Sequence, residues 1–195
     1  KPTGKNYCAE KARVRLATVR IHGQTFSSNR AQLTDNRLIV AFGGCDTRLG
    51  YDVEVTDDWI AFRLKEIAGT RPTHVTLLTI GVRISEHGGR RLNASWNDEM
   101  AVCVRGINLQ TQGSLRRAGN HSILTAVAQD TPGPPLEGSG VALIVAPPQD
   151  LKPILSRLAH ACDLPQNEVD GVASRDLPIA RQSYWFLRFS EQDVD

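Results

Sequence analysis

The chain has 195 residues, of which 41% are hydrophobic and 23% are charged, and its formal net charge is +2. These values are ordinary for a folded globular protein and exclude an intrinsically disordered chain. No apolar run approaches the roughly 20 residues that a membrane-spanning helix needs, so we expect no membrane partner; the sequence leaves the compartment open and favours the cytoplasm.

From residue 13 to about 130, apolar and polar positions alternate, with turn residues at roughly the 8–12-residue spacing of all-β domains. The stretch 51–56 shows this alternation clearly, and an acidic turn leads from it into 59–64, which predicts a hairpin. Further strands are predicted at 14–21, 38–42, 75–84, 92–96, 100–105 and 122–129. We therefore predict a mainly β fold in which residues 1–135 form an antiparallel β-sandwich, or supersandwich.

The pattern changes after a proline-rich stretch. Residues 140–146 are apolar at consecutive positions, as in a strand covered on both faces. Apolar residues then recur at helical spacing from Leu151 to Cys162, and a final aromatic strand is predicted at 183–189. We interpret residues 136–195 as a strand–helix–strand connector. In the alternative, 140–146 is the last strand of the sandwich and 183–189 is the first strand of a following domain.

The end of the sequence combines that aromatic strand with the start signal of a helix. Ser190 and Asp193 have the spacing of a capping box, in which a hydroxyl precedes a carboxylate, yet the sequence ends soon afterwards. We therefore expect the chain to be an N-terminal piece of a longer protein. Tyr184 and Trp185, in the final strand, are predicted to lie at the interface with the next domain.

Residues 138–195 carry a resemblance to known proteins. An apolar strand at Gly140, an amphipathic helix closed by 163–165, and the aromatic sequence from Ser183 to the capping box resemble the N-terminal region of multidomain glycoside hydrolases, somewhat as in α-galactosidase-like enzymes. In those families a galactose-mutarotase-like β-supersandwich precedes a catalytic (β/α)8 barrel. The resemblance implies that the catalytic residues lie on that barrel, so we assign no catalytic residue to this chain.

The richest cluster of groups suited to sugar binding lies at 91–99. A sugar site needs a flat apolar ring for the C–H face and planar polar groups for the hydroxyls. The candidate ligand-binding residues are Trp96, Asn97, Asp98 and Arg91, with Asn93 and Glu99 beside them. The alternative is a strand end at which Trp96 covers the core while a polar turn reverses the chain.

Other motifs indicate no catalytic or metal chemistry. Cys8, Cys45, Cys103 and Cys162 have neither CxxC spacing nor a histidine at ligand spacing, so we expect structural thiols, no metal and no cofactor. Adjacent acidic residues on a strand point to opposite faces and do not flank one substrate bond. Most of the 23 basic residues are arginines that occur singly, without the basic stripe of a nucleic-acid-binding protein, so no nucleic-acid partner is expected.

The sequence and the resemblance together predict a non-catalytic N-terminal β-sandwich domain of a carbohydrate-active enzyme, a glycoside hydrolase. Its role would be to support a catalytic barrel that follows in the same chain. The alternative is a stand-alone carbohydrate-binding module that uses Trp96 and its polar neighbours. The expected partners are therefore carbohydrate and the downstream domain.

Overall fold

The computed structural model describes residues 5–9, 16–130, 135–165, 168–169 and 172–173. The chain divides into two units, residues 1–164 and 165–195. In the second unit, the described residues form a short antiparallel pair of strands, β13 (Glu168–Val169) and β14 (Val172–Ala173). All other described elements belong to the first unit.

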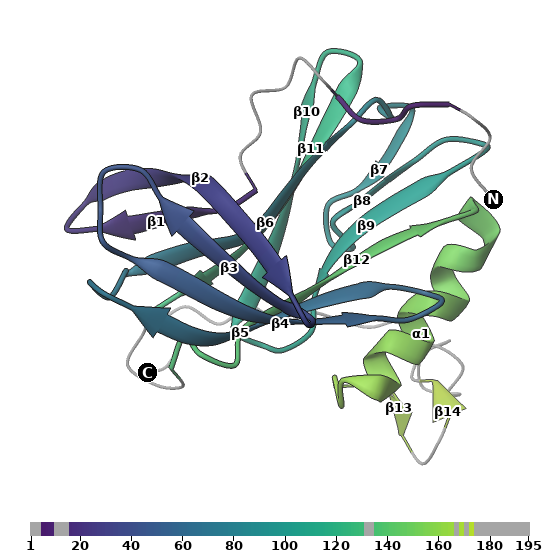
Figure 1. Ribbon diagram of the computed structural model, residues 1–195. Helices are drawn as coiled ribbons and strands as arrows, with labels where there is room; N and C mark the ends of the chain where they lie inside the picture. The colour runs from purple at the N-terminus through teal and green to yellow at the C-terminus, as the bar shows by residue number, and fades with distance from the viewer. Residues whose placement is uncertain (1–4, 10–15, 131–134, 166–167, 170–171, 174–195) are drawn as a thin grey trace, which may run out of the picture. The chain divides into compact units, whose positions relative to one another are not determined.

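Twelve antiparallel strands make up the sheet in the described part of the first unit, which confirms the predicted mainly β class (Figure 1). They are β1 (Thr18–Ile21), β2 (Gln24–Thr34), β3 (Arg37–Phe42), β4 (Arg48–Val55), β5 (Ile60–Ala68), β6 (His74–Val82), β7 (His87–Gly89), β8 (Ala94–Trp96), β9 (Ala101–Gly106), β10 (Thr111–Ala118), β11 (His121–Gln129) and β12 (Gly140–Ala146). Their order in the sheet is β10-β11-β6-β1-β2-β3-β4-β5-β12-β9-β8-β7. Many chain neighbours are thus also sheet neighbours, as hairpin connections produce.

A single nearly closed, barrel-like sheet stands where we expected a sandwich of two layers. The reason lies in β2, which pairs with β1 through 24–27 and with β3 through 28–34, and so continues the sheet without a break. The two ends of the sheet meet where the Ser95 hydroxyl of β8 lies 2.9 Å from the Ser122 hydroxyl of β11.

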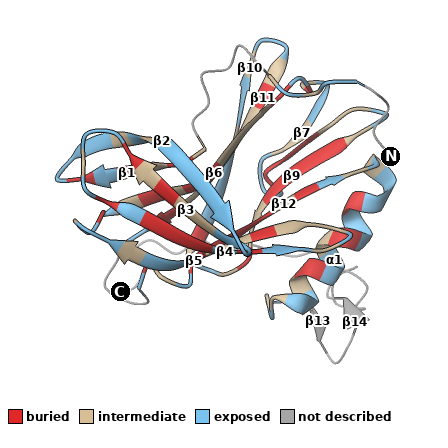
Figure 2. Ribbon diagram, in the orientation of Figure 1, coloured by how far each residue is buried: buried red, intermediate tan, exposed pale blue. Residues whose placement is uncertain are grey.

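The interior of the sheet holds the main hydrophobic core. Strand β11 shows the expected alternation, because every second residue from Ser122 to Ala128 is buried and those between are half-buried. Figure 2 shows buried positions recurring along the neighbouring strands. Other residues that contribute to this core include Val19, Val40, Tyr51, Leu64 and Val104.

Strand β12 lies inside the sheet, between β5 and β9 and antiparallel to both. The structure therefore has the alternative placement of 140–146, as a strand of the β domain itself. Val141 belongs to the interior core, while Ala142 and Ile144 lie in a second cluster with helix α1 (Leu151–Ala161). Because both faces are covered, β12 has apolar residues at consecutive positions.

Helix α1 follows a 3-10 turn, η1 (Pro148–Asp150), and confirms the helix expected from the periodicity. Its buried residues are Leu151, Ile154 and Leu158. Arg157 forms an ion pair with Asp58, with nitrogen–oxygen distances of 2.7 and 2.8 Å, and so ties the helix to the turn between β4 and β5. Neither α1 nor any other described helix has the length and apolar character needed to cross a membrane.

Two predictions concern residues outside the described part of the chain. One is the final strand at 183–189, and the other is the role of Tyr184 and Trp185 at a domain interface. Both stay predictions.

Candidate functional site

The N-terminal segment 5–9 pairs with the end of β6 and reaches the turn between β8 and β9. Backbone hydrogen bonds of 2.8 and 3.1 Å join it to 81–83 in antiparallel register. This pairing places the side chains of Lys5 and Tyr7 against Glu99. Residues from distant parts of the sequence thus form one surface.

The turn from β8 into β9 is shaped by Asn97. Its side-chain oxygen accepts hydrogen bonds from the backbone N–H groups of Glu99 (3.0 Å) and Met100 (2.9 Å), and its own N–H donates to the Met100 carbonyl (3.0 Å). Asparagine is favoured in turns because its side chain can bond to the backbone in this way. The side-chain nitrogen, Nδ2, makes no hydrogen bond with another described residue and can contact a ligand.

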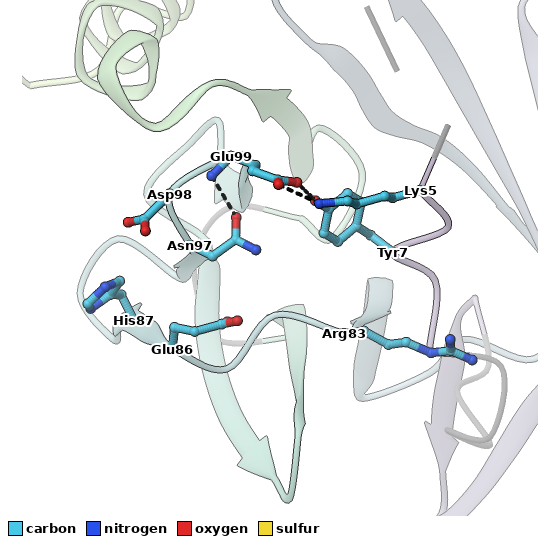
Figure 3. Close-up of a pocket in the computed structure, with 8 residues that line it drawn as sticks. All are labelled: Lys5, Tyr7, Arg83, Glu86, His87, Asn97, Asp98 and Glu99. Atoms are coloured by element: carbon cyan, nitrogen blue, oxygen red, sulfur yellow. Dashed lines mark hydrogen bonds and ion pairs between the residues drawn. The ribbon is translucent and has the colours of Figure 1, made fainter. Parts of the chain in front are cut away.

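A pocket of about 400 Å³ opens between the N-terminal segment, the start of β7 and the β8–β9 turn (Figure 3). Its lining residues are Lys5, Tyr7, Arg83, Glu86, His87, Asn97, Asp98 and Glu99. In Figure 3, Asp98 and His87 lie at one end, Lys5 and Tyr7 lie at the other, and Asn97 lies between them. The lining is polar, with ring surfaces supplied by Tyr7 and His87.

Glu99 is held by two donors at one end of this pocket. Lys5 Nζ forms an ion pair with one carboxylate oxygen, and the Tyr7 hydroxyl donates to the other. The hydrogen bonds from Lys5 and Tyr7 lower the pKa of Glu99, and the bond to Glu99 raises the pKa of Lys5. Glu99 therefore stays ionised near neutral pH and anchors the N-terminal segment.

The other two carboxylates of the pocket differ in how they are bonded. The backbone N–H of Ser85 donates to Glu86 (2.9 Å), and the backbone N–H groups of Glu86 and Ser85 lower the pKa of this carboxyl. The Asp98 carboxylate makes no hydrogen bond or ion pair with any other described residue. Asp98 is therefore the acceptor in the pocket that is open to a ligand.

Trp96 supports His87 and does not itself line the pocket. The β7–β8 register pairs the two residues directly, and their rings stack with centroids 5.9 Å apart and an interplanar angle of 23°. The half-buried indole also packs against the cluster of α1. Trp96 thus packs at the end of a strand, as in the alternative interpretation, and stacks on a ring of the pocket; its role in ligand binding stays a prediction.

The other candidates from the sequence separate into two groups. Asn97 and Asp98 lie together in the pocket, whereas Arg91 is exposed and outside its lining. Asn93 is 2% exposed, and its amide donates to backbone carbonyls of β9 (2.7 Å) and β11 (2.9 Å). Asn93 therefore joins strands inside the fold and has no open side toward the pocket.

Sequence reasoning missed five pocket residues, namely Lys5, Tyr7, Arg83, Glu86 and His87. The N-terminal pair reaches the pocket through pairing with β6, which no local pattern indicates. His87 and the two glycines after it form the short strand β7, which none of the predicted strands covers. The polar pair Glu86-His87 beside these glycines was the one signal available.

None of the described residues that line the pocket is a cysteine. The four cysteines, all within the described residues, are free, and burial raises the pKa of the Cys103 thiol to about 12. Such a thiol is a poor nucleophile near neutral pH. No group of three or more His, Cys, Asp or Glu residues in the described part of the chain is placed to hold a metal ion.

No protein-family model, no curated protein and no solved structure matches this chain. The pocket itself is therefore the main indication of function. Its acceptors are carboxylates, its donors are an amide and two cationic side chains, and its rings are fixed by packing. This combination is suited to hydrogen bonding with a small polar ligand.

Proposed function

We propose that this chain is a non-catalytic β domain of a carbohydrate-active protein, and that the pocket around 97–99 binds a neutral sugar. The observation that carries the proposal is the lining, in which the rings of His87 and Tyr7 accompany carboxylate and amide groups. The volume of about 400 Å³ lies within the range of about 300–1,000 Å³ common for small-ligand sites. A sugar has hydroxyl groups at its edge and C–H groups on its faces, and this lining complements both.

The balance of charge in the pocket favours a neutral ligand. Its charged lining residues are Lys5, Arg83, Glu86, Asp98 and Glu99. Lys5 and Glu99 already form an ion pair. An ion of either sign would meet a repelling group, whereas hydroxyl groups can donate to the carboxylates and accept from the cations.

We assign separate roles to three residues of the pocket. Asp98 accepts hydrogen bonds from sugar hydroxyls, because its carboxylate has no partner among the described residues. The Asn97 amide nitrogen donates to a sugar oxygen, since the side-chain oxygen is used in the turn. His87, held in place by its stacked neighbour, provides a flat surface for the C–H face.

The ionisation of the two pocket glutamates favours binding over hydrolysis. Glycoside hydrolysis needs a carboxyl group with a raised pKa as the acid, beside a second carboxylate that is ionised. The pKa of Glu99 is lowered by Lys5 and Tyr7, and the pKa of Glu86 is lowered by backbone N–H groups. Neither carboxyl group carries the proton that a general acid must deliver.

The wider proposal is that the domain precedes and supports a catalytic (β/α)8 barrel. It rests on the resemblance of 138–195 to the region of α-galactosidase-like enzymes that contains a galactose-mutarotase-like supersandwich. In this arrangement Tyr184 and Trp185 pack at the junction. A coding sequence that continues beyond Asp195 with alternating strands and helices for about 250 residues supports it, and a stop codon close to Asp195 contradicts it.

Calorimetric titration with a panel of neutral mono- and disaccharides tests the sugar pocket. Asp98→Ala should weaken binding by about tenfold or more, because a hydrogen bond to a charged group contributes about 1.5–3 kcal/mol. The matched control is Asp57→Ala, which removes an exposed turn carboxylate outside the pocket. Equal affinity in the wild type and Asp98→Ala, or no binding to any sugar of the panel, would contradict the proposal.

A further inference from the structure

Three residues, Arg30 of β2, Ala41 of β3 and Arg48 of β4, are paired across adjacent strands and form what we call the arginine row. The register pairs Arg30 with Ala41, and Ala41 with Arg48. Directly paired residues in an antiparallel sheet point to the same face, so the two arginines flank the small Ala41 side chain. This face is opposite to the one on which Val40 and Phe42 are buried in the core.

A bulge beside Arg30 marks this row. The pairing of β2 with β3 shifts between Ser28 and Arg30, which leaves Asn29 as an extra residue in β2. Bulges change the direction of neighbouring side chains and are common beside functional sites.

The three residues of the arginine row line two neighbouring hollows. The smaller one, of about 200 Å³, is lined by Arg30, Gln32, Ile39, Ala41 and Arg48. The larger one, of about 470 Å³, lies toward Asn29 and Asp46. The methyl group of Ala41 leaves this space open between two long side chains.

Neither Arg30 nor Arg48 forms an ion pair with another described residue, although other surface arginines do. Arg37 of β3 binds Glu66 of β5 across the intervening strand β4, and Arg157 binds Asp58. The carboxylate of Asp46 lines the larger hollow but not the smaller one, and it accepts a hydrogen bond from the Thr70 backbone N–H (3.2 Å). The smaller hollow is therefore lined by two positive charges and no acid.

We propose that the smaller hollow binds a tetrahedral oxyanion, a phosphate or sulfate group. Strands are spaced by about 4.8 Å, so the backbones of Arg30 and Arg48 lie roughly 10 Å apart, and both guanidinium groups can reach one ligand between them. A guanidinium group forms two parallel hydrogen bonds to an oxyanion. A tetrahedral group offers enough oxygens for both arginines and for the Gln32 amide, whereas a carboxylate has only two. The site shares no residue with the sugar pocket and does not depend on it.

Thermal unfolding in sodium sulfate, sodium phosphate and sodium chloride at equal ionic strength tests the proposal. Sulfate and phosphate should raise the Tm of the wild type above its value in chloride, because a ligand that binds only the folded state stabilises it. Because both anions also stabilise folded proteins in general through exclusion from the surface, Arg30→Gln and Arg48→Gln should each reduce this difference, and the control Arg116→Gln, an exposed arginine on β10, should keep it in full. Equal rises in all four proteins would overturn the proposal.

Two further variants separate a shaped site from a general attraction between charges. Ala41→Leu fills the hollow and keeps both arginines, so it should weaken sulfate binding by about tenfold in calorimetric titration. Arg48→Lys keeps the charge but loses the paired hydrogen bonds, and should also bind more weakly. Wild-type affinity in both variants would contradict the proposed geometry. Titration with a sulfated and a phosphorylated monosaccharide then distinguishes an ester group on a sugar from the free ion.

Discussion

The Tyr7 hydroxyl donates a hydrogen bond to a carboxylate oxygen of Glu99, which lies 92 residues further along the chain. Lys5 binds the other oxygen of the same carboxylate. These contacts hold the N-terminal segment against the β8–β9 turn and complete one end of the pocket. The packing of the N-terminal segment on the β8–β9 turn, and the proposed binding function of the pocket, thus both depend on the ionised Glu99 carboxylate.

The stability of the protein should fall in acid partly because Glu99 becomes protonated. Its pKa is lower in the folded protein than in the unfolded chain, so the ionised form favours the folded state. This contribution is present above the unfolded pKa of about 4.3 and is lost as the pH falls through the lower folded pKa. Thermal unfolding across this range should show a weaker pH dependence for Glu99→Gln. The control Glu54→Gln, at an exposed position of β4, should behave as the wild type, and an unchanged curve for Glu99→Gln would contradict the account.

The stacked pair of His87 and Trp96 should matter for sugar affinity although Trp96 lies outside the pocket. Trp96→Leu removes the ring that holds His87, and a stacked pair contributes about 0.5–1.5 kcal/mol, so affinity should fall by about two- to tenfold. Trp59→Leu is the matched control, because Trp59 packs against the same cluster but not against His87. If both variants lose affinity equally in calorimetric titration, the effect is one of general packing and the role assigned to the stack is wrong.

Asn93 should be one of the more sensitive positions for stability. Its buried amide donates to the Val104 carbonyl of β9 and the Thr125 carbonyl of β11, so its loss leaves the buried Val104 carbonyl without this partner, at a cost of about 1–3 kcal/mol. Its φ of 51° also favours asparagine or glycine. Denaturant unfolding of Asn93→Ala and Asn93→Gly separates the two effects. We expect both variants to be strongly destabilised, and a glycine variant as stable as the wild type would show that the hydrogen bonds contribute little.

Cys103 should resist alkylation in the folded protein. Its thiol is fully buried, donates a hydrogen bond to the Leu92 carbonyl (3.1 Å), and has a pKa raised to about 12 by burial. The thiolate that reacts with iodoacetamide is therefore scarce at about pH 8. Mass spectrometry should find Cys8, which is exposed, modified first and Cys103 modified only in denaturant. Equal rates at the two thiols would show that this part of the sheet opens readily.

The strands that could be predicted have a regular apolar pattern, either alternation along a strand with one buried face or, in β12, an apolar run in a strand covered on both faces. In β4 the apolar residues alternate with polar ones, and the acidic turn after it leads into the apolar start of β5, so both strands and their hairpin were found from the pattern. Strand β2 was missed because nearly all of its eleven residues are exposed or half-buried, which leaves no alternation to detect. Yet β2 is the strand that joins the two parts of the sheet, and its absence from the prediction favoured a sandwich over one continuous sheet.

Only those pocket residues that lie together in one short stretch of the sequence could be predicted. Asn97 and Asp98 were found because a polar turn beside an aromatic residue is visible in a short stretch of sequence. Tyr7 and Lys5 were not, because their position is set by backbone pairing with β6, more than seventy residues away. Pairing between distant segments depends on the whole sheet, and a local pattern of side chains does not specify it.

The pocket around Asn97 and Asp98 is proposed to bind a neutral sugar. The most direct test is a titration of the ¹⁵N-labelled protein with the sugar panel, followed by amide NMR spectra. The account predicts progressive, saturable shifts at residues 86–87 and 97–99, which disappear in Asp98→Ala and remain in Asp57→Ala. Saturable shifts confined to other parts of the protein, or no shifts with any sugar, would contradict it.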